Sequence, residues 1–285
     1  MPPLRLRAVN VLVAALIITG ACTLTCGLLL VVHRFGGRDV LLTDTTRGAG
    51  VYGVVGTSFA VLLAFVVLVA FESYNDAREG AEQEADAVEE LYRNAEFFPD
   101  ARKEIQENLL CYGRAVVAHD WPAMRDQERS SVVSHWSLAL QDAAERLPVR
   151  TAKEQWAFGD LLTLRNDRVD ARRQRLTQAT PIITGPVWFF LGIGALLNIA
   201  FVVVFLDRRG ESLLVHCILM ASVTAVVVAG LLLVWFLDHP YEDADGGIKP
   251  IEMEHTLTSL EEEHPDLKPP CDSDGAPLAR RPELS

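Results

Sequence analysis

The chain has 285 residues, half of them hydrophobic, and its 38 Asp and Glu against 26 Lys and Arg give a net charge of −12. This acidic balance argues against a nucleic-acid partner, because the phosphate backbone attracts basic proteins. Five cysteines in a chain of this length do not indicate a disulfide framework. The sequence contains no phosphate-binding loop, no nucleophile elbow and no zinc-protease or paired-cysteine motif. We therefore expect no catalytic site, no cofactor and no metal, and we do not expect an enzyme.

The apolar residues are concentrated in four uncharged runs, each long enough to cross a bilayer core of about 30 Å. These runs cover residues 8–32, 51–71, 181–206 and 213–237. The first is longer than the apolar core of a cleaved signal peptide, so we interpret it as a permanent helix. The predicted fold is an all-α polytopic membrane protein, with one pair of transmembrane helices within 1–71 and a second within 181–237.

The polar parts of the chain lie between and after these pairs. Residues 72–180 keep helical periodicity and are predicted to form a helical block. Within this block, Thr151 and Glu154 form a capping-box pattern, which predicts a helix that runs to about Ala179. Residues 238–285 hold half of the prolines and an excess of acidic side chains, and we expect a mostly disordered acidic tail.

One segment of the tail partly matches a calcium-binding loop. Asp243, Asp245 and Glu254 have suitable side chains, but Ile248 stands where such a loop requires glycine. A solvated tail is therefore the preferred interpretation over a cation site.

The second run passes into polar, helix-favouring sequence without a proline, so about 51–95 is predicted as one long helix. At about 100° per residue, one face of this helix carries Ser58, Leu62, Phe65, Val69, Glu72 and Asp76. The opposite face carries a stripe of small residues suited to close helix packing, namely Gly53, Gly56, Ala60 and Ala64. The first face either meets lipid or a neighbouring helix, or it lines a pore, and the pattern leaves both alternatives open.

The last helix of the block carries a basic stripe, which consists of Arg165, Arg168, Arg172 and Arg175. The helix that leaves the second span is acidic. The stripe is expected to pair with those carboxylates or with lipid phosphates. The alternative is a ring of arginines that attracts anions to a vestibule.

An even number of spans places both termini and the helical block on the same side of the membrane. Seven arginines flank the spans on that side: Arg5, Arg7, Arg78, Arg168, Arg172, Arg173 and Arg175. Five flank them on the other side: Arg34, Arg38, Arg47, Arg208 and Arg209. The positive-inside rule then predicts that both termini and the block are cytoplasmic.

The order of these elements, together with several short motifs, resembles the bestrophin-like family of bacterial four-helix membrane proteins over about residues 5–255. The motifs are Leu62 to Val67, Phe71 to Tyr74, Ala77, Glu84-Ala85, Leu91 to Arg93, Trp121 to Met124, Leu237 to Tyr241 and Ile248 to Pro250. The family is remotely similar to the bestrophins, which are pentameric ion channels whose second helix lines a narrow apolar neck.

The resemblance implies a multi-pass protein of the bacterial inner membrane that forms a homo-oligomer, with the pentamer of the bestrophins as the expected form, and passes inorganic ions. The predicted partners are thus the lipid bilayer, other copies of the chain and ions, with no nucleic acid. Some bestrophins respond to calcium through acidic residues after the fourth helix, but only Glu242, Asp243 and Asp245 occupy that region here. The alternative is a non-conducting membrane scaffold that binds a partner through its cytoplasmic helices and acidic tail.

In the channel hypothesis, the predicted pore face would present Leu62, Phe65 and Val69 as an apolar constriction. Glu72 and Asp76 would follow at the cytoplasmic mouth, where carboxylates concentrate cations. The sequence therefore favours cations over anions.

Overall fold

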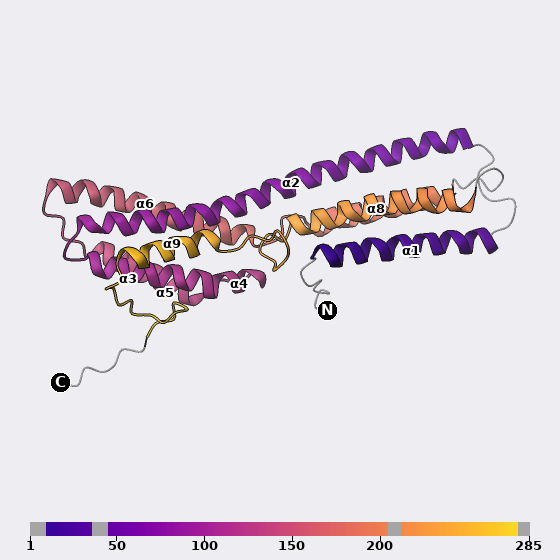
Figure 1. The fold of residues 1–285 in the computed structure, drawn as a ribbon. Helices are drawn as coiled ribbons and strands as arrows, with labels where there is room; N and C mark the ends of the chain where they lie inside the picture. Colours follow the sequence, from indigo (N-terminus) through magenta and orange to yellow (C-terminus); the bar gives the residue numbers. More distant parts are fainter. Residues whose placement is uncertain (1–9, 36–44, 205–211, 279–285) are drawn as a thin grey trace. The chain divides into compact units, whose positions relative to one another are not determined.

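The structure is a computed structural model that describes residues 10–35, 45–204 and 212–278 (Figure 1). Its helices are α1 (Val11–Phe35), α2 (Thr45–Asn94), η1 (Ala95–Phe97), α3 (Arg102–Ala115), η2 (Val116–Asp120), α4 (Trp121–Arg125), α5 (Ser131–Glu145), α6 (Ala152–Gln178), α7 (Gly185–Val204), α8 (Leu213–Leu237) and α9 (Ile251–Glu263). The described ranges contain no strand, and a single isolated bridge joins Cys271 and Pro277.

The chain divides into two compact units. Unit 1 comprises residues 1–74, 181–239 and 243–246, and unit 2 comprises residues 75–180, 240–242 and 247–285.

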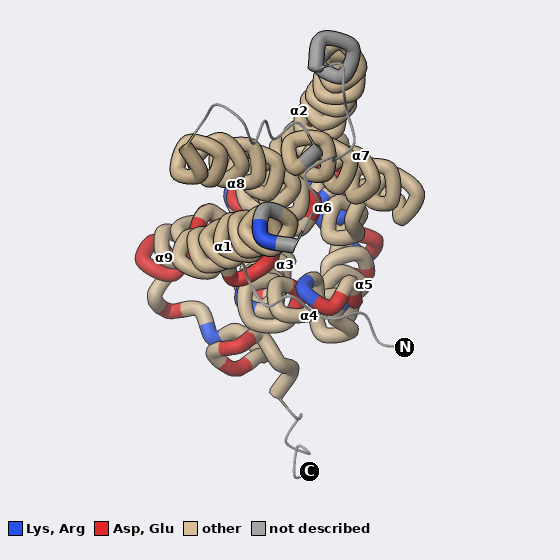
Figure 2. Tube along the Cα trace, turned by 90° about the vertical axis from the view of Figure 1, so that its right-hand side faces the viewer, with Lys and Arg blue, Asp and Glu red and all other residues tan. Residues whose placement is uncertain are grey.

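Within the described residues, four helical segments are long and apolar enough to cross a membrane. They are Val11–Val32, a part of Gly50–Phe97, Gly185–Val203 and Leu213–Leu237. Figure 2 shows α7 and α8 as tubes without charged residues along their length. The predicted all-α polytopic membrane fold is therefore confirmed.

The helix α2 is one continuous helix of 50 residues, as its sequence predicts. It begins at Thr45, earlier than the predicted Val51, and ends shortly before Pro99. Proline lacks the amide hydrogen that would extend the helical ladder, which accounts for the break. The helix contributes its first part to unit 1 and its second part to unit 2.

In unit 1, large side chains of α2 pack against small residues of α7 and α8. The core consists of Phe59, Val66, Leu191, Ala195, Val227 and Val234. A Cβ atom added to Gly194 would lie 2.4 Å from Cδ2 of Phe59, and one added to Gly230 would lie 2.8 Å from Cδ2 of Leu63. These two glycines therefore make room for the α2 side chains, as small residues do between membrane helices.

Substituting Gly194 with alanine is expected to destabilise the detergent-solubilised protein, because the new methyl group would overlap the Phe59 ring. Overpacking of this kind costs about 1–3 kcal/mol. Gly192→Ala is the matched control on the same helix, since nothing lies within 4 Å of its added Cβ. Thermal unfolding should show a lower midpoint for Gly194→Ala only, and equal midpoints for both variants would contradict this packing.

The helix α1 packs against α8 in the same unit. Thr224 donates a hydrogen bond of 3.2 Å to Thr25 between buried side chains, and Leu29 and Met220 are fully buried. At the end of α8, the buried Asp238 accepts hydrogen bonds from the amides of Ile182 and Ile183 at 2.8 and 2.9 Å. Asp238 thus fixes the segment that leads into α7.

Unit 2 is a bundle built around α3, which contacts α5 and α9. The predicted capping box is confirmed at the start of α6. The Thr151 hydroxyl accepts from the amide of Glu154 at 3.1 Å, and the Glu154 carboxylate accepts from the amide of Thr151 at 2.8 Å. The fourth helix of the block therefore begins where the sequence places it.

The C-terminal region differs from the predicted disordered tail. Residues Ile251–Glu263 form α9, whose Met253, Leu257 and Leu260 are buried. Gly113 of α3 provides the space, because a Cβ at this position would lie 2.8 Å from Cδ2 of Leu257. The average composition of the tail is polar, but Met253, Leu257 and Leu260 give α9 a buried apolar face, and α9 packs against α3.

Candidate functional site

The predicted pore face of α2 is largely exposed in the single chain. Ser58, Leu62, Phe65, Val69 and Glu72 are exposed, and Asp76 is half-buried. Phe65 has 64% of its surface exposed, which is unusual for a large apolar side chain unless lipid or another chain covers it. This face is therefore free to contact lipid or another subunit.

The predicted packing stripe is not the face by which α2 packs within the chain. Gly53, Ala60 and Ala64 are exposed, and only Gly56 approaches another helix, with its added Cβ 3.4 Å from the Asn198 side chain. The buried face lies between the two predicted faces and carries Phe59. In this contact the small residues lie on the partner helices, as Gly194 of α7 and Gly230 of α8, and the packing role of the stripe stays a prediction.

The side of α2 that points away from its own bundle can be located from the buried residues. At about 100° per residue, Val61 and Leu68 lie opposite the packed side chains of Phe59 and Val66, and Phe65 lies about 110° from them, still on the outward half of the helix. All three are exposed. Phe65 belongs both to this outward side and to the face predicted from the sequence.

A network of buried charges lies in unit 2. Arg175 on α6 is 0% exposed and donates through Nε and Nη2 to the two carboxylate oxygens of Glu84 on α2. Its Nη2 also donates to Asp120 Oδ2 at 3.0 Å. Tyr112 on α3 donates its hydroxyl proton to Glu84. One guanidinium thereby joins carboxylates from two segments of the chain.

Asp120 completes the network from the π-helical segment η2. It accepts from Nε of Arg172 at 3.1 Å, from Nη2 of Arg172 at 3.3 Å and from the amide of Ser130 at 2.9 Å. Burial opposes ionisation of the Asp120 carboxyl, but the positive charges of Arg175 and Arg172 outweigh it and hold its pKa below the ordinary value. Burial likewise opposes protonation of Arg175, but the Glu84 charge outweighs it and raises the Arg175 pKa. Asp120 and Arg175 therefore stay ionised at neutral pH.

Arg168 differs from its neighbours in the stripe. It is 1% exposed, stacks 4.4 Å above the Tyr112 ring and donates to the Ser137 hydroxyl at 3.1 Å. Its Nε has no hydrogen-bond partner in the described part of the chain. Since Arg168 and Arg175 are both buried, they do not face a solvent-filled vestibule in this unit, whereas Arg165 is half-buried.

Residues from distant motifs meet beside this network. The Trp121 ring lies 4.8 Å from the Arg175 guanidinium, and its Nε1 donates to the Ile248 carbonyl at 3.1 Å. Tyr241 packs edge-on against Trp121 and donates to the Ala77 carbonyl at 2.9 Å. Among the described residues, the arrangement holds no nucleophile–base pair. Its hydrogen bonds and ring contacts instead connect α2, α6 and the segment that follows α8.

Sequence reasoning identified part of this network. It expected the arginines to pair with the acidic helix, and Arg175 does so through Glu84. It missed Asp120, because a π-helical turn shifts side-chain directions in a way that a regular helical wheel does not anticipate. It also missed the disulfide between Cys111 and Cys271. The available signal was that these two cysteines alone lie outside the apolar runs.

One group of side chains in the described ranges has the composition of a metal site. Oxygen and nitrogen atoms of Glu96, Glu263 and His264 lie within 4.8 Å of one another. Both glutamates are exposed, and His264 Nε2 lies 3.8 Å from a carboxylate oxygen of Glu96. Asp243 and Asp245, the candidate cation ligands of the tail, are also exposed.

Comparison with known proteins gives consistent matches. The bestrophin-like domain family matches residues 19–244. A crystal structure of a bacterial bestrophin homologue from Klebsiella pneumoniae with a single substitution aligns with a TM-score of 0.66 at 13% identity, covering 87% of this chain and 99% of that one. Another structure of this homologue, from zinc phasing, gives a TM-score of 0.65 at 13% identity, with coverages of 89% and 98%.

A further crystal structure, of a membrane protein with a single substitution, aligns with a TM-score of 0.67 at 12% identity and covers 86% of this chain and 96% of that one. At such identities the likeness concerns the fold alone. Comparison with curated proteins gives no significant match.

Proposed function

This chain belongs to the bestrophin-like family, and on that basis we propose that it assembles into a homo-oligomeric ion channel in which α2 of each subunit lines the pore. The observation that carries the proposal is the outward side of α2. It is apolar, exposed and continuous with a carboxylate at Glu72.

A ring of subunits would use the faces of α2 in different ways. The buried side, with Phe59, stays on its own bundle, and the outward side with Phe65 faces the axis. The small residues Gly53, Ala60 and Ala64 then remain for contact with the next subunit, where they permit close approach. Rings of large apolar side chains such as Phe65 would form a constriction that gates by dewetting.

Ion preference should follow Glu72, which is exposed after the last apolar turn. Carboxylates repeated around an axis raise the local cation concentration. Glu72→Gln is therefore expected to shift the reversal potential under a salt gradient toward the anion value. Glu128→Gln, an exposed carboxylate in the loop between α4 and α5, is the control. If Glu72→Gln and the parent have the same reversal potential, Glu72 does not lie on the ion path.

The proposed location is the bacterial inner membrane, with both termini and unit 2 in the cytoplasm, as the arginine distribution favours. A topology reporter fused after Arg125, an exposed residue at the end of α4, should report the cytoplasm. A periplasmic signal at this position would reverse the proposed orientation.

A further inference from the structure

The segment after α9 forms a shaped strap over unit 2. We define the strap as residues 267–278. The Asp272 carboxylate accepts from the amides of Asp274 and Ala276 at 3.0 and 2.8 Å, and the amide of Leu278 donates to the Pro270 carbonyl at 3.0 Å. These contacts close a tight loop with its own internal hydrogen bonds.

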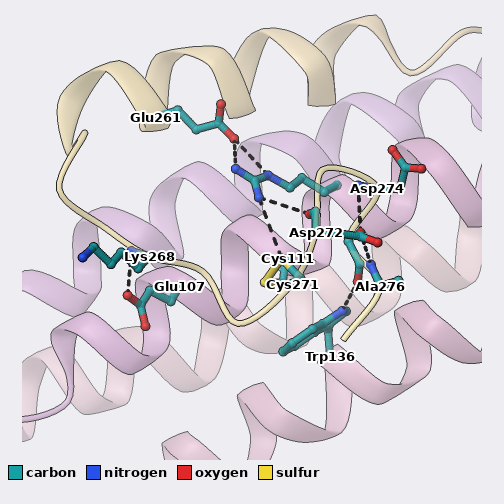
Figure 3. Close-up of a disulfide and its surroundings, with 11 residues drawn as sticks. Glu107, Cys111, Trp136, Glu261, Lys268, Cys271, Asp272, Asp274 and Ala276 are labelled. Atoms are coloured by element: carbon teal, nitrogen blue, oxygen red, sulfur yellow. Dashed lines mark hydrogen bonds and ion pairs between the residues drawn. A yellow bond between two sulfur atoms is a disulfide. The ribbon is translucent and has the colours of Figure 1, made fainter. Parts of the chain in front are cut away.

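A disulfide attaches the strap to α3 (Figure 3). It joins Cys271 of the strap to Cys111 of α3 across a sequence separation of 160 residues. Cys111 is 0% exposed and Cys271 is 5% exposed, so the bond is buried while the strap is in place. The other three cysteines lie in α1 and α8 and are free.

The strap is also positioned without the disulfide. Nε1 of Trp136 on α5 donates to the Gly275 carbonyl at 2.6 Å (Figure 3), and the Lys268 amide donates to the Glu107 carboxylate at 2.9 Å. Nη1 of Arg114 donates to the Asp272 carbonyl at 3.2 Å. When both sulfurs are thiols, these contacts favour the position in which Cys271 lies beside Cys111, although without the bond the strap can leave it.

Gly275 is the residue that allows this close approach. It has a φ of +79°, and an added Cβ would lie 2.3 Å from the backbone nitrogen of Ala115. Both the left-handed conformation and the contact with the α3 backbone require glycine. The strap therefore has one seated position, and that position presents the two sulfurs to each other.

We propose that Cys111 and Cys271 are a reversible oxidation site that controls attachment of the strap to α3 and α5. The proposal rests on the cytoplasmic location of unit 2, where disulfides are transient and respond to redox conditions, because the thiol pool is kept reduced. A permanent structural disulfide would instead belong to an oxidising compartment.

The chemistry is thiol–disulfide exchange with a small-molecule disulfide of the glutathione class. The Cys271 thiolate attacks one sulfur of that disulfide, which forms a mixed disulfide and releases one small thiolate. The Cys111 thiolate then attacks the Cys271 sulfur, forms the protein disulfide and releases the second small thiolate. The protein loses two electrons and two protons in total, and the small disulfide becomes two thiols. Reduction is the reverse exchange.

The oxidation state of Cys111 and Cys271 can be measured in cells that express the full chain. Cells are quenched in acid, and free thiols are labelled with a mass tag before and after a thiol-specific oxidant. We expect Cys111 and Cys271 to be reduced in growing cells, oxidised after treatment and reduced again after recovery. A pair that is oxidised under all conditions, or never oxidised, would overturn the proposal. The topology reporter reads the location independently, and neither result depends on ion conduction.

A second measurement tests whether the strap geometry governs the exchange. Purified full-length protein is reduced and then oxidised with a small disulfide, and the rate of protein disulfide formation is followed. Gly275→Ala should slow this rate by about tenfold or more, because a strap that is unseated most of the time rarely brings the sulfurs together. Gly159→Ala on α6, whose added Cβ meets nothing within 4 Å, is the control. Equal rates for the two variants would contradict the proposal.

Amide hydrogen exchange measures whether reduction of the disulfide loosens the attachment of the strap. Reduction of the parent should accelerate exchange of the Ala276 and Leu278 amides by about tenfold or more, because the strap then opens locally. In Cys271→Ser, exchange should be fast and unaffected by reductant. Strap amides that exchange equally slowly in the oxidised and reduced parent would show that the disulfide does not control attachment.

Discussion

Arg175→Met is expected to destabilise the protein by about 3–5 kcal/mol, the typical effect of removing one partner from a buried ion pair. The variant leaves Glu84 and Asp120 buried, with only Arg172 to offset the two negative charges. Chemical denaturation of the detergent-solubilised protein, followed by a probe in unit 2, measures the change.

The matched control is Arg173→Met on the same helix. Arg173 pairs with Asp170, and both side chains are 68% exposed, so this pair should add almost nothing to stability. If Arg175→Met unfolds at the same denaturant concentration as Arg173→Met, the buried network does not stabilise unit 2.

The loss caused by Arg175→Met should also depend on pH. In the parent the Asp120 pKa is depressed, so its stabilising contribution is complete above the ordinary aspartate pKa of about 3.9 and is lost as the pH falls through the depressed value. The variant lacks most of that contribution at any pH. The stability difference between parent and variant should therefore be greatest near neutral pH and should shrink in acid.

Phe65→Ala is expected to increase the ionic conductance of the assembled protein several-fold. Phe65 is exposed on the outward side of α2, and removing its ring would widen the apolar constriction and lower the barrier to wetting. Single-channel current in planar bilayers measures the effect.

Phe190→Ala is the control for the same chemical change elsewhere. Phe190 is exposed on α7 and is not part of the predicted pore face of α2, so its loss should leave the conductance of the parent unchanged. If Phe65→Ala and the parent have equal conductance, Phe65 does not line the pore, even if the protein conducts ions.

The membrane fold was predictable because it depends on patterns that lie within single segments. Four uncharged runs of sufficient length give the spans, and the absence of proline after Phe71 gives the continuous α2. The Thr151–Glu154 capping box is likewise local. None of these features requires knowledge of which helix meets which.

The contacts between segments were harder to predict from the sequence. A helical wheel of α2 identifies a small-residue face, but the packing between Phe59 and Gly194 depends equally on the sequence of α7. The tail has a disordered composition on average, yet Leu257 and Cys271 each find a partner on α3. The predicted pore face of Ser58, Leu62, Phe65, Val69, Glu72 and Asp76 stays a prediction, because its role is defined only by copies of the chain around an axis.

The most direct test of the channel proposal is a current recording from purified full-length protein in a planar bilayer under a salt gradient. The proposed function predicts discrete current steps whose reversal potential lies on the cation side, in agreement with Glu72 at the mouth. The absence of current from both the parent and Phe65→Ala, in protein that has inserted into the bilayer, would contradict the channel proposal.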